Sequence, residues 1–247
     1  MKKLFTKAFL GILAVGTSTV AFAQEAAEAA APVEGGVHQA LKTKFIEGSA
    51  DFMSFVAIAL ILGLAFVLER IIYLNLADVN PNGMLSEIEA ALDRGDVDGA
   101  KAIARDTRGP IASIAYQGLM RIDQGIDVVE KSIVAYGGVQ SGLLEKNLSW
   151  ITLFIAMAPS LGFLGTVVGM IMAFDKIERV GDISPTVVAG GMKVALITTV
   201  GGLIVALILQ VFYNYLLSKL EAILNKMEDA SITLLDMVIK YNVKYKK

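Results

Sequence analysis

The sequence predicts an all-α membrane protein with three transmembrane helices that continue as long cytoplasmic helical extensions. Hydrophobic residues make up 55% of the 247 residues and charged residues only 19%. The mean hydropathy of +0.62 is too high for a soluble domain of this length. Three runs also have the roughly 20 apolar residues that a helix needs to cross a bilayer core of about 30 Å. They span residues 52–70, 150–174 and 194–217.

The composition excludes several classes of function. The chain has no cysteine, which rules out disulfides, zinc–thiolate sites and iron–sulfur clusters. Its one histidine, His38, leaves little scope for imidazole chemistry. The net charge of −2 gives no basic surface for nucleic acid. We therefore expect no metal site, no cofactor and no nucleic-acid partner.

The first 23 residues have the pattern of a secretory signal peptide. Three lysines precede an apolar run over residues 8–20, and residues 21–23 give the small-x-small cleavage pattern. The alternative is an uncleaved first span, but the apolar run is short for one. Cleavage after Ala23 would place the next segment on the exported side of the membrane.

Residues 24–51 are expected to form a periplasmic linker followed by an amphipathic helix. The stretch up to Gly36 is rich in Ala, Glu and Gly, as flexible linkers are. From residue 37 to 50, apolar side chains recur at helical spacing between charged ones. This predicts a short helix on the outer membrane surface, with His38 as a solvated residue.

Two arguments give the orientation of the spans. If the signal peptide is cleaved, the first span runs from outside to inside, and the others alternate. Independently, Lys and Arg are concentrated in residues 71–149 and in the tail over residues 218–247, as the positive-inside rule requires of cytoplasmic segments. We therefore predict a bacterial inner-membrane protein with a periplasmic N-terminus, a periplasmic loop over residues 175–193 and a cytoplasmic C-terminus.

The segment over residues 71–149 is predicted to be helical and too small for an independent enzyme domain. Asn82 is expected to cap a helix over residues 84–94 that Gly95 ends. Asp96 is then expected to cap the next helix.

Pro110 starts a further helix that is broken at Gly125. A long helix is predicted from near Ile126, with no proline before Pro159 inside the second span. In the tail, apolar residues repeat at helical spacing over residues 220–240, so the third span is also expected to continue as a helix.

The second and third spans lack the groups that catalysis needs. Neither contains Asp, Glu, Lys, Arg or His. An intramembrane enzyme would require acids, bases or a metal cluster, so we expect that the chain is not an enzyme.

Small residues are instead frequent in these two spans. They recur four residues apart, as in Gly165 and Gly169, a pattern that lets two helix backbones approach closely in lipid. The residues predicted to pack the helices are Gly162, Gly165, Gly169 and Gly202.

Thr166 and Thr199 allow two interpretations. Each hydroxyl could bond only to a carbonyl of its own helix. Alternatively, both could face an internal cavity and interact with water or a partner. Helical periodicity alone leaves both interpretations open.

The two spans also carry recognisable motifs. Ala158-Pro159, followed by Leu161-Gly162-Phe163-Leu164-Gly165-Thr166-Val167-Val168-Gly169, resembles the second-span signature of the MotA/TolQ/ExbB proton-channel family. The run from Ala195 through Thr198-Thr199 to Leu203 is similar to its third-span signature, and Glu69-Arg70 and Tyr213-Asn214 fit as well. The resemblance covers roughly residues 50–225, and three spans fit ExbB or TolQ, whereas MotA has four.

The resemblance implies a homopentamer around a central pore. The pore would enclose the single spans of two ExbD-like or TolR-like subunits, whose carboxylate carries the proton. The pore-lining role would fall on Thr166 and Thr199, with Thr198 as a neighbour that shares it. Output to a TonB-like protein would then energise import through outer-membrane receptors.

One position departs from the family pattern. ExbB-type chains often have a glutamate in the third span just before the Ala-Leu pair, and the matching residue here is Val194, next to Lys193. A glutamate-dependent step on this subunit is therefore in doubt. Lys193 is expected to extend to the outer interface, with cation repulsion or pairing to the partner's acid as alternatives.

The function expected from the sequence is the scaffold subunit of a proton-driven motor. A TolQ-like subunit for envelope maintenance is one alternative. A passive membrane scaffold that carries no protons is another.

Overall fold

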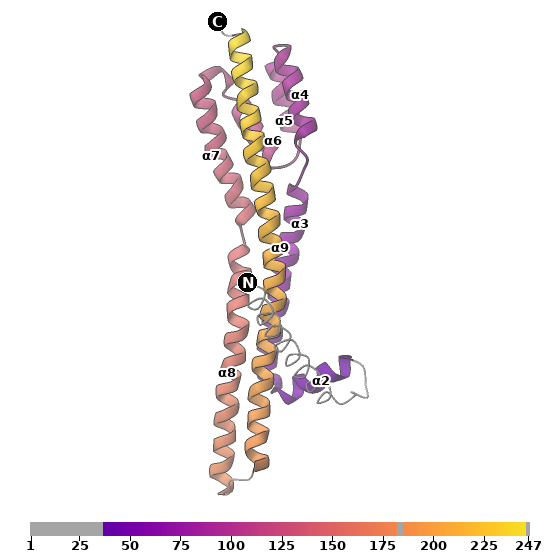
Figure 1. Ribbon diagram of the computed structural model, residues 1–247, viewed down its shortest axis with the longest axis vertical. Helices are drawn as coiled ribbons and strands as arrows, with labels where there is room; N and C mark the ends of the chain where they lie inside the picture. Colours follow the sequence, from indigo (N-terminus) through magenta and orange to yellow (C-terminus); the bar gives the residue numbers. More distant parts are fainter. Residues whose placement is uncertain (1–36, 182–184, 246–247) are drawn as a thin grey trace, which may run out of the picture.

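The computed structural model describes residues 37–181 and 185–245 and forms a long rod of helices (Figure 1). The predicted signal peptide and linker lie outside this range. The helices are α2 (Val37–Glu47), α3 (Ala50–Ala77), α4 (Asn82–Asp93), α5 (Val97–Asp106), α6 (Pro110–Leu119), the short 3₁₀ helix η1 (Ile122–Gln124), α7 (Ile126–Glu145), α8 (Leu148–Val180) and α9 (Pro185–Tyr245).

One end of the rod, which we call the stem, consists of α3, α8 and residues 185–217 of α9. Among the described residues, three helices are long and apolar enough to cross a membrane, as judged by length and composition. They carry the three predicted spans, so the all-α prediction with three apolar helices is confirmed. Many large apolar side chains of the stem are exposed, among them Phe55, Ile61, Phe163, Phe174 and Leu207. A soluble monomer rarely exposes so much apolar surface.

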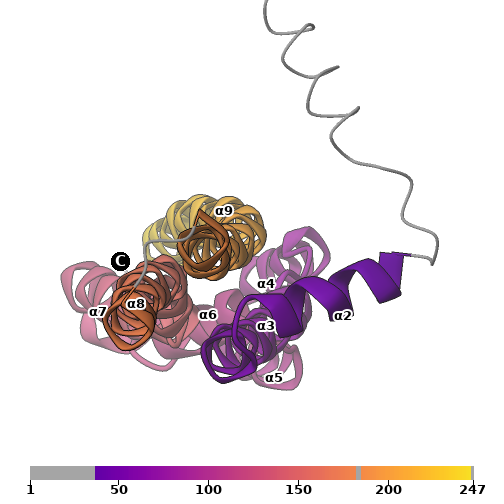
Figure 2. The same cartoon turned by 90° about the horizontal axis from the view of Figure 1, so that it is seen from below.

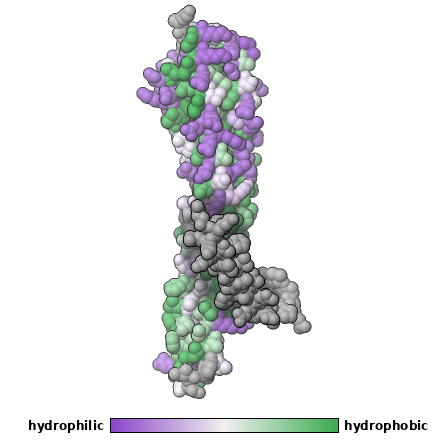
Figure 3. Space-filling model, in the orientation of Figure 1, coloured by the Kyte–Doolittle hydropathy of each residue, from purple (hydrophilic) through white to green (hydrophobic). Residues whose placement is uncertain are grey.

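The other end, which we call the head, consists of residues 78–147 and 218–245. Helices α4, α6 and α7 pack against the second half of α9 there, and α5 packs against α4 and α6 (Figure 1). Hydrophilic residues dominate the visible surface of the head, and hydrophobic residues that of the stem (Figure 3). The buried apolar side chains of α9 recur at intervals of three, four or seven residues and continue from stem to head: Val205, Leu209, Leu216, Leu220, Ile223, Met227, Ala230 and Leu234. One core therefore runs along α9.

Several helix ends follow the predicted turn chemistry. Gly95 and Gly125 adopt positive φ angles of 79° and 100°, which favour glycine, and each separates two helices. Asp96 caps α5 by accepting a hydrogen bond from the N–H of Gly99 at 2.8 Å. The predicted cap by Asn82 is wrong: Asn82 is the first residue of α4, and the Asn80 side chain accepts a hydrogen bond from its N–H at 3.1 Å.

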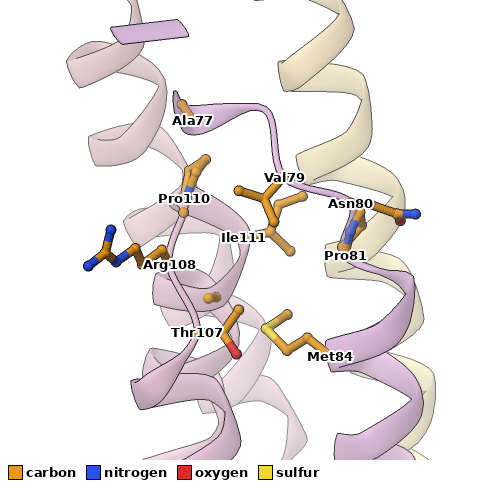
Figure 4. Close-up of a pocket in the computed structure, with 11 residues that line it drawn as sticks. Ala77, Val79, Asn80, Pro81, Met84, Thr107, Arg108, Pro110 and Ile111 are labelled. Atoms are coloured by element: carbon orange, nitrogen blue, oxygen red, sulfur yellow. The ribbon is translucent and has the colours of Figure 1, made fainter. Parts of the chain in front are cut away.

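Stem and head meet at a tight joint. The segment after α3 packs against the turn before α6 and leaves a partly open cavity of about 10 Å³ (Figure 4). Met84 and Val79 point into this space, whereas Arg108 points away from it. A cavity of this volume holds about one water molecule, so it is too small to be a ligand site.

The long helix predicted from Ile126 is broken. It starts at Ile126 but ends at Glu145, and α8 begins only at Leu148. Asn147 takes a left-handed conformation, with φ 68°. Asparagine tolerates this conformation better than most residues, so it ends a helix here without glycine or proline.

The predicted periplasmic loop over residues 175–193 is mostly helical. Helix α8 continues to Val180, and α9 already begins at Pro185. Gly181 ends α8 with a φ of 71°. The sequence boundary marks where charges begin at Asp175, but a helix does not have to end where its apolar stretch ends.

The predicted amphipathic helix is present as α2. It extends away from the three stem helices when the rod is viewed along its axis (Figure 2). Its C-terminal end joins α3 through Gly48 and Ser49.

Candidate functional site

The site is the contact between α8 and α9 in the stem. All four glycines predicted to pack helices lie in it. A Cβ on Gly162 would lie 2.8 Å from the carbonyl oxygen of Thr198, and one on Gly202 would overlap the carbonyl of Ala158. Gly165 faces the Thr198 side chain, and Gly169 faces Ala195. The two backbones therefore approach so closely that larger residues would not fit.

Thr166 and Thr199 meet across this contact. Their hydroxyl groups hydrogen-bond to each other. The Thr166 hydroxyl also lies 3.0 Å from the carbonyl oxygen of Ala195, and the Thr199 hydroxyl lies 3.4 Å from that of Gly162. Each hydroxyl therefore reaches a carbonyl of the opposite helix, which a purely intrahelical bond would not do.

Neither threonine of this pair is fully buried. Thr166 and Thr199 are both half-buried. Each hydroxyl has one proton, which the other hydroxyl or a carbonyl already accepts, but its oxygen can accept a further hydrogen bond from a group that approaches. The two spans that carry the pair, residues 150–174 and 194–217, supply no carboxylate, amine or imidazole. The pair can bind or orient a proton-carrying group but does not itself titrate.

Thr198 lies elsewhere, although it is the neighbour of Thr199. Its side chain is fully buried against Gly165, and its hydroxyl donates to the carbonyl of Ala195 in its own helix at 2.8 Å. Successive residues of a helix are about 100° apart, so the two threonines take different faces of α9. Thr198 thus serves the packing between α8 and α9 and does not join the pair of Thr166 and Thr199.

The stem end near the head contains a buried cation that sequence reasoning did not single out. Arg70 is only 3% exposed and makes two hydrogen bonds to Glu69, at 2.7 and 2.5 Å. It also lies 3.5 Å from the carbonyl oxygen of Leu143, near the end of α7. The Glu69 carboxylate accepts a hydrogen bond from Asn147 at 3.4 Å.

This network attaches α3 to the break between α7 and α8. Helix ends leave carbonyls without partners, and a cation is favourable there. The sequence showed the charged pair Glu69-Arg70 next to an apolar run. It could not show what the pair binds, because Leu143 and Asn147 are more than 70 residues away.

Lys193 binds a residue of the same chain. Its amine lies 2.8 Å from the Glu47 carboxylate of α2, while Val194 beside it is half-buried. Hydrogen bonds from Lys193 and then Lys44 lower the pKa of Glu47 below its ordinary value of 4.5. The described residues contain no cluster of three or more His, Cys, Asp or Glu side chains that could hold a metal ion.

The sequence of residues 106–229, half of the chain, matches the MotA/TolQ/ExbB proton channel family. The chain belongs to this family. The match includes α8, the threonine pair and most of α9. The sequence-based assignment to the family is thereby confirmed, and the chain is a multi-pass membrane protein of ExbB type.

Several curated proteins named ExbB are similar to this chain. The putative biopolymer transport protein ExbB homolog of Methanothermobacter thermautotrophicus is 28% identical over 169 residues, which cover 68% of this chain and 60% of the relative. The biopolymer transport protein exbB1 of Vibrio cholerae is 36% identical over 33% of this chain and 39% of its own length. The ExbB protein of Aquifex aeolicus is 36% identical over 32% of this chain and 53% of its own length. The matches thus span between about two fifths and three fifths of these relatives.

Proposed function

We propose that this ExbB-like chain is the scaffold subunit of a proton-driven motor in the bacterial inner membrane. The observation that carries the proposal is the half-buried Thr166–Thr199 hydroxyl pair, set in a contact without charged groups. Because this contact has hydroxyl groups but no group that binds a proton itself, the proton would be carried by a carboxylate of another chain. In this proposal the chain itself catalyses no reaction.

The hydroxyl pair would act on the charge of the partner's carboxylate. An ionised carboxylate in an apolar pore is costly unless it is hydrogen-bonded, and the two hydroxyls would supply donors for it by turning away from the carbonyls of Ala195 and Gly162. Once protonated, the carboxyl group is neutral and can pass the apolar wall of the pore. One proton crossing 100 mV releases about 2.3 kcal/mol, so several protons would drive one working stroke.

The proposed assembly is a homopentamer that encloses two ExbD-like single-span subunits. Its support is the apolar surface that one chain leaves uncovered on the stem, which neighbouring copies, partner helices and membrane lipids would cover. On α7, Val128, Val134 and Val139 are also exposed, although this helix belongs to the head. The distribution of Lys and Arg supports a cytoplasmic head and a periplasmic N-terminus.

The work would be delivered to a TonB-like protein for import through the outer membrane. A TolQ-like role in envelope maintenance uses the same scaffold, and the identity of the partner separates the two. A passive scaffold without proton transport is the alternative of a different class.

The proposal is tested by co-expression with the candidate single-span partner. Native mass spectrometry of the extracted complex should show five copies of this chain with two partners. In proteoliposomes with an imposed proton gradient, the complex should take up protons, and this chain without its partner should not. A monomer or dimer that ignores the partner, or a complex that carries no protons, would contradict the motor.

A further inference from the structure

The end of α2, the connection to α3 and the first turn of α3 each make one contact with α9. Lys193 forms its ion pair with Glu47 at 2.8 Å. One turn further along α9, Ile197 lies so close to Gly48 that a Cβ there would be 2.8 Å from the Ile197 Cγ2 atom. After another turn, a Cβ on Gly201 would lie 3.0 Å from the Met53 methyl group.

These three contacts lie on one stripe of α9. Lys193, Ile197 and Gly201 are spaced four residues apart, and residues at this spacing share a helix face. The connection itself is held in an unusual conformation, because Ser49 has a positive φ of 65°. A non-glycine residue at such an angle indicates that surrounding contacts fix the backbone.

Thr199 lies on a different face of α9 from this stripe, at about the same height along the helix as Ile197 and Gly201. Thr199 lies between Ile197 and Gly201 in the sequence and about 120° away from Lys193 around the helix. Lys193 precedes it by about 9 Å along the helix axis. Contacts on the stripe therefore add to those of α8 in setting the rotation and height of α9 where Thr199 faces Thr166.

We propose that Lys193 and Glu47 form a latch through which α2 positions the first part of α9, and with it Thr199, against α8. Lys193 is then a positioning residue and not an electrostatic barrier to protons. The effect on transport rests on the proposed function, whereas the latch itself does not. The two charged groups are partly exposed, at 54% for Lys193 and 28% for Glu47, so they form a contact that one substitution can open.

The structure offers a matched control. Lys44 forms a second ion pair with the same carboxylate at 3.0 Å, but within α2. Replacing Lys44 removes the same kind of charge from Glu47 and leaves the link between α2 and α9 in place. Replacing Lys193 removes that link.

The latch is tested first by the mobility of α2. The chain has no cysteine, so a spin label attached to Thr43→Cys reports on α2 alone. The label should be restrained in the parent protein and in Lys44→Gln, and mobile in Lys193→Gln. In the Lys44→Gln background, the charge exchange Glu47→Lys with Lys193→Glu should restore the restraint. An unchanged spectrum in Lys193→Gln would overturn the latch.

Proton uptake by the reconstituted complex then tests the positioning role. Lys193→Gln and Glu47→Gln should each reduce uptake about twofold to fivefold, the effect of losing one partly exposed ion pair. The charge exchange should restore it, and Lys44→Gln should leave it unchanged. Reduced uptake that the exchange does not restore, with α2 still restrained, would show that Lys193 acts as a charge at the entrance and would overturn the positioning role. If the parent complex carries no protons, the proposed function fails, while the spin label still decides on the latch.

Discussion

Helix α9 contacts α8 along its first half and the head along its second half, and the two contacts differ in chemistry. The first uses glycines, close backbones and hydroxyl groups, and no charged residue falls within residues 194–217. The second adds ion pairs to apolar packing: Lys219 and Lys226 bind Asp78, and Lys240 binds Glu89 and Asp93.

The difference follows from the expected surroundings. Charged side chains are costly in lipid, so a membrane contact gains its stability from close approach and internal hydrogen bonds. In water, ion pairs form easily but each contributes little. Added volume should therefore be damaging in the first contact, and lost charge should be mild in the second.

The largest effect is expected from Gly202→Val. The new side chain would overlap the carbonyl of Ala158, so the backbones of α8 and α9 would have to separate. We expect a loss of about 3 kcal/mol or more in the free energy of unfolding, the upper range for overpacking. Thermal unfolding in detergent, followed by circular dichroism, measures it.

Gly138→Ala is the matched control. Its Cβ would meet nothing within 4 Å, and alanine favours a helix by up to about 1 kcal/mol. Equal stability of the two variants would contradict the close contact between α8 and α9.

Arg70→Gln is expected to have the next largest effect. It removes a buried cation and leaves the Leu143 carbonyl and the Glu69 carboxylate with fewer partners. The expected cost is about 2 kcal/mol, measured by the same unfolding assay. Lys146→Gln, an exposed charge beside the same helix break, serves as the control and should cost little. A cost no larger than that of the control would show that Arg70 does not hold the break.

A smaller, pH-dependent effect is expected for Asp78. Hydrogen bonds from Lys219 and then Lys226 lower its pKa below the ordinary value of 3.8. A carboxyl group with a lowered pKa in the folded state stabilises the protein above 3.8, and this contribution is lost as the pH falls through the folded pKa. Asp78→Asn should therefore cost about 1 kcal/mol at neutral pH and progressively less below pH 3.8. If Asp78→Asn lowered the free energy of unfolding equally at neutral pH and below pH 3.8, the charge of Asp78 would not be the source of the effect.

The smallest effect is expected for Lys240→Ala. Its ion pairs with Glu89 and Asp93 are 3.1 and 3.2 Å long, and the Lys240 side chain is 55% exposed. Removing them should leave the stability measured by urea unfolding almost unchanged. A loss as large as that for Gly202→Val would contradict the comparison between the two contacts.

The sequence predicted the parts of this fold that depend on local chemistry. Hydropathy located the three long helices, and Gly95, Asp96 and Gly125 set helix ends because their effects reach only a few residues. The break at Asn147 escaped prediction because its stabilising partner, Glu69, is 78 residues away.

The candidate site was predicted in composition but not in geometry. The four-residue spacing identified the packing glycines. Periodicity could not tell which of Thr198 and Thr199 faces Gly165 and which meets Thr166, since that depends on the rotation of α9 against α8. The partner of Lys193 is 146 residues away and was equally inaccessible from the sequence.

Proton uptake by the double variant Thr166→Val with Thr199→Val tests the central claim most directly. The complex with its single-span partner would be reconstituted in liposomes and compared with Thr152→Val, whose hydroxyl bonds only to carbonyls of its own helix. Loss of hydrogen bonds worth roughly 1.4 kcal/mol predicts a decrease of about tenfold in the double variant. Thr152→Val should match the parent protein. Parental uptake by the double variant would contradict a role of the hydroxyl pair in the proton pathway.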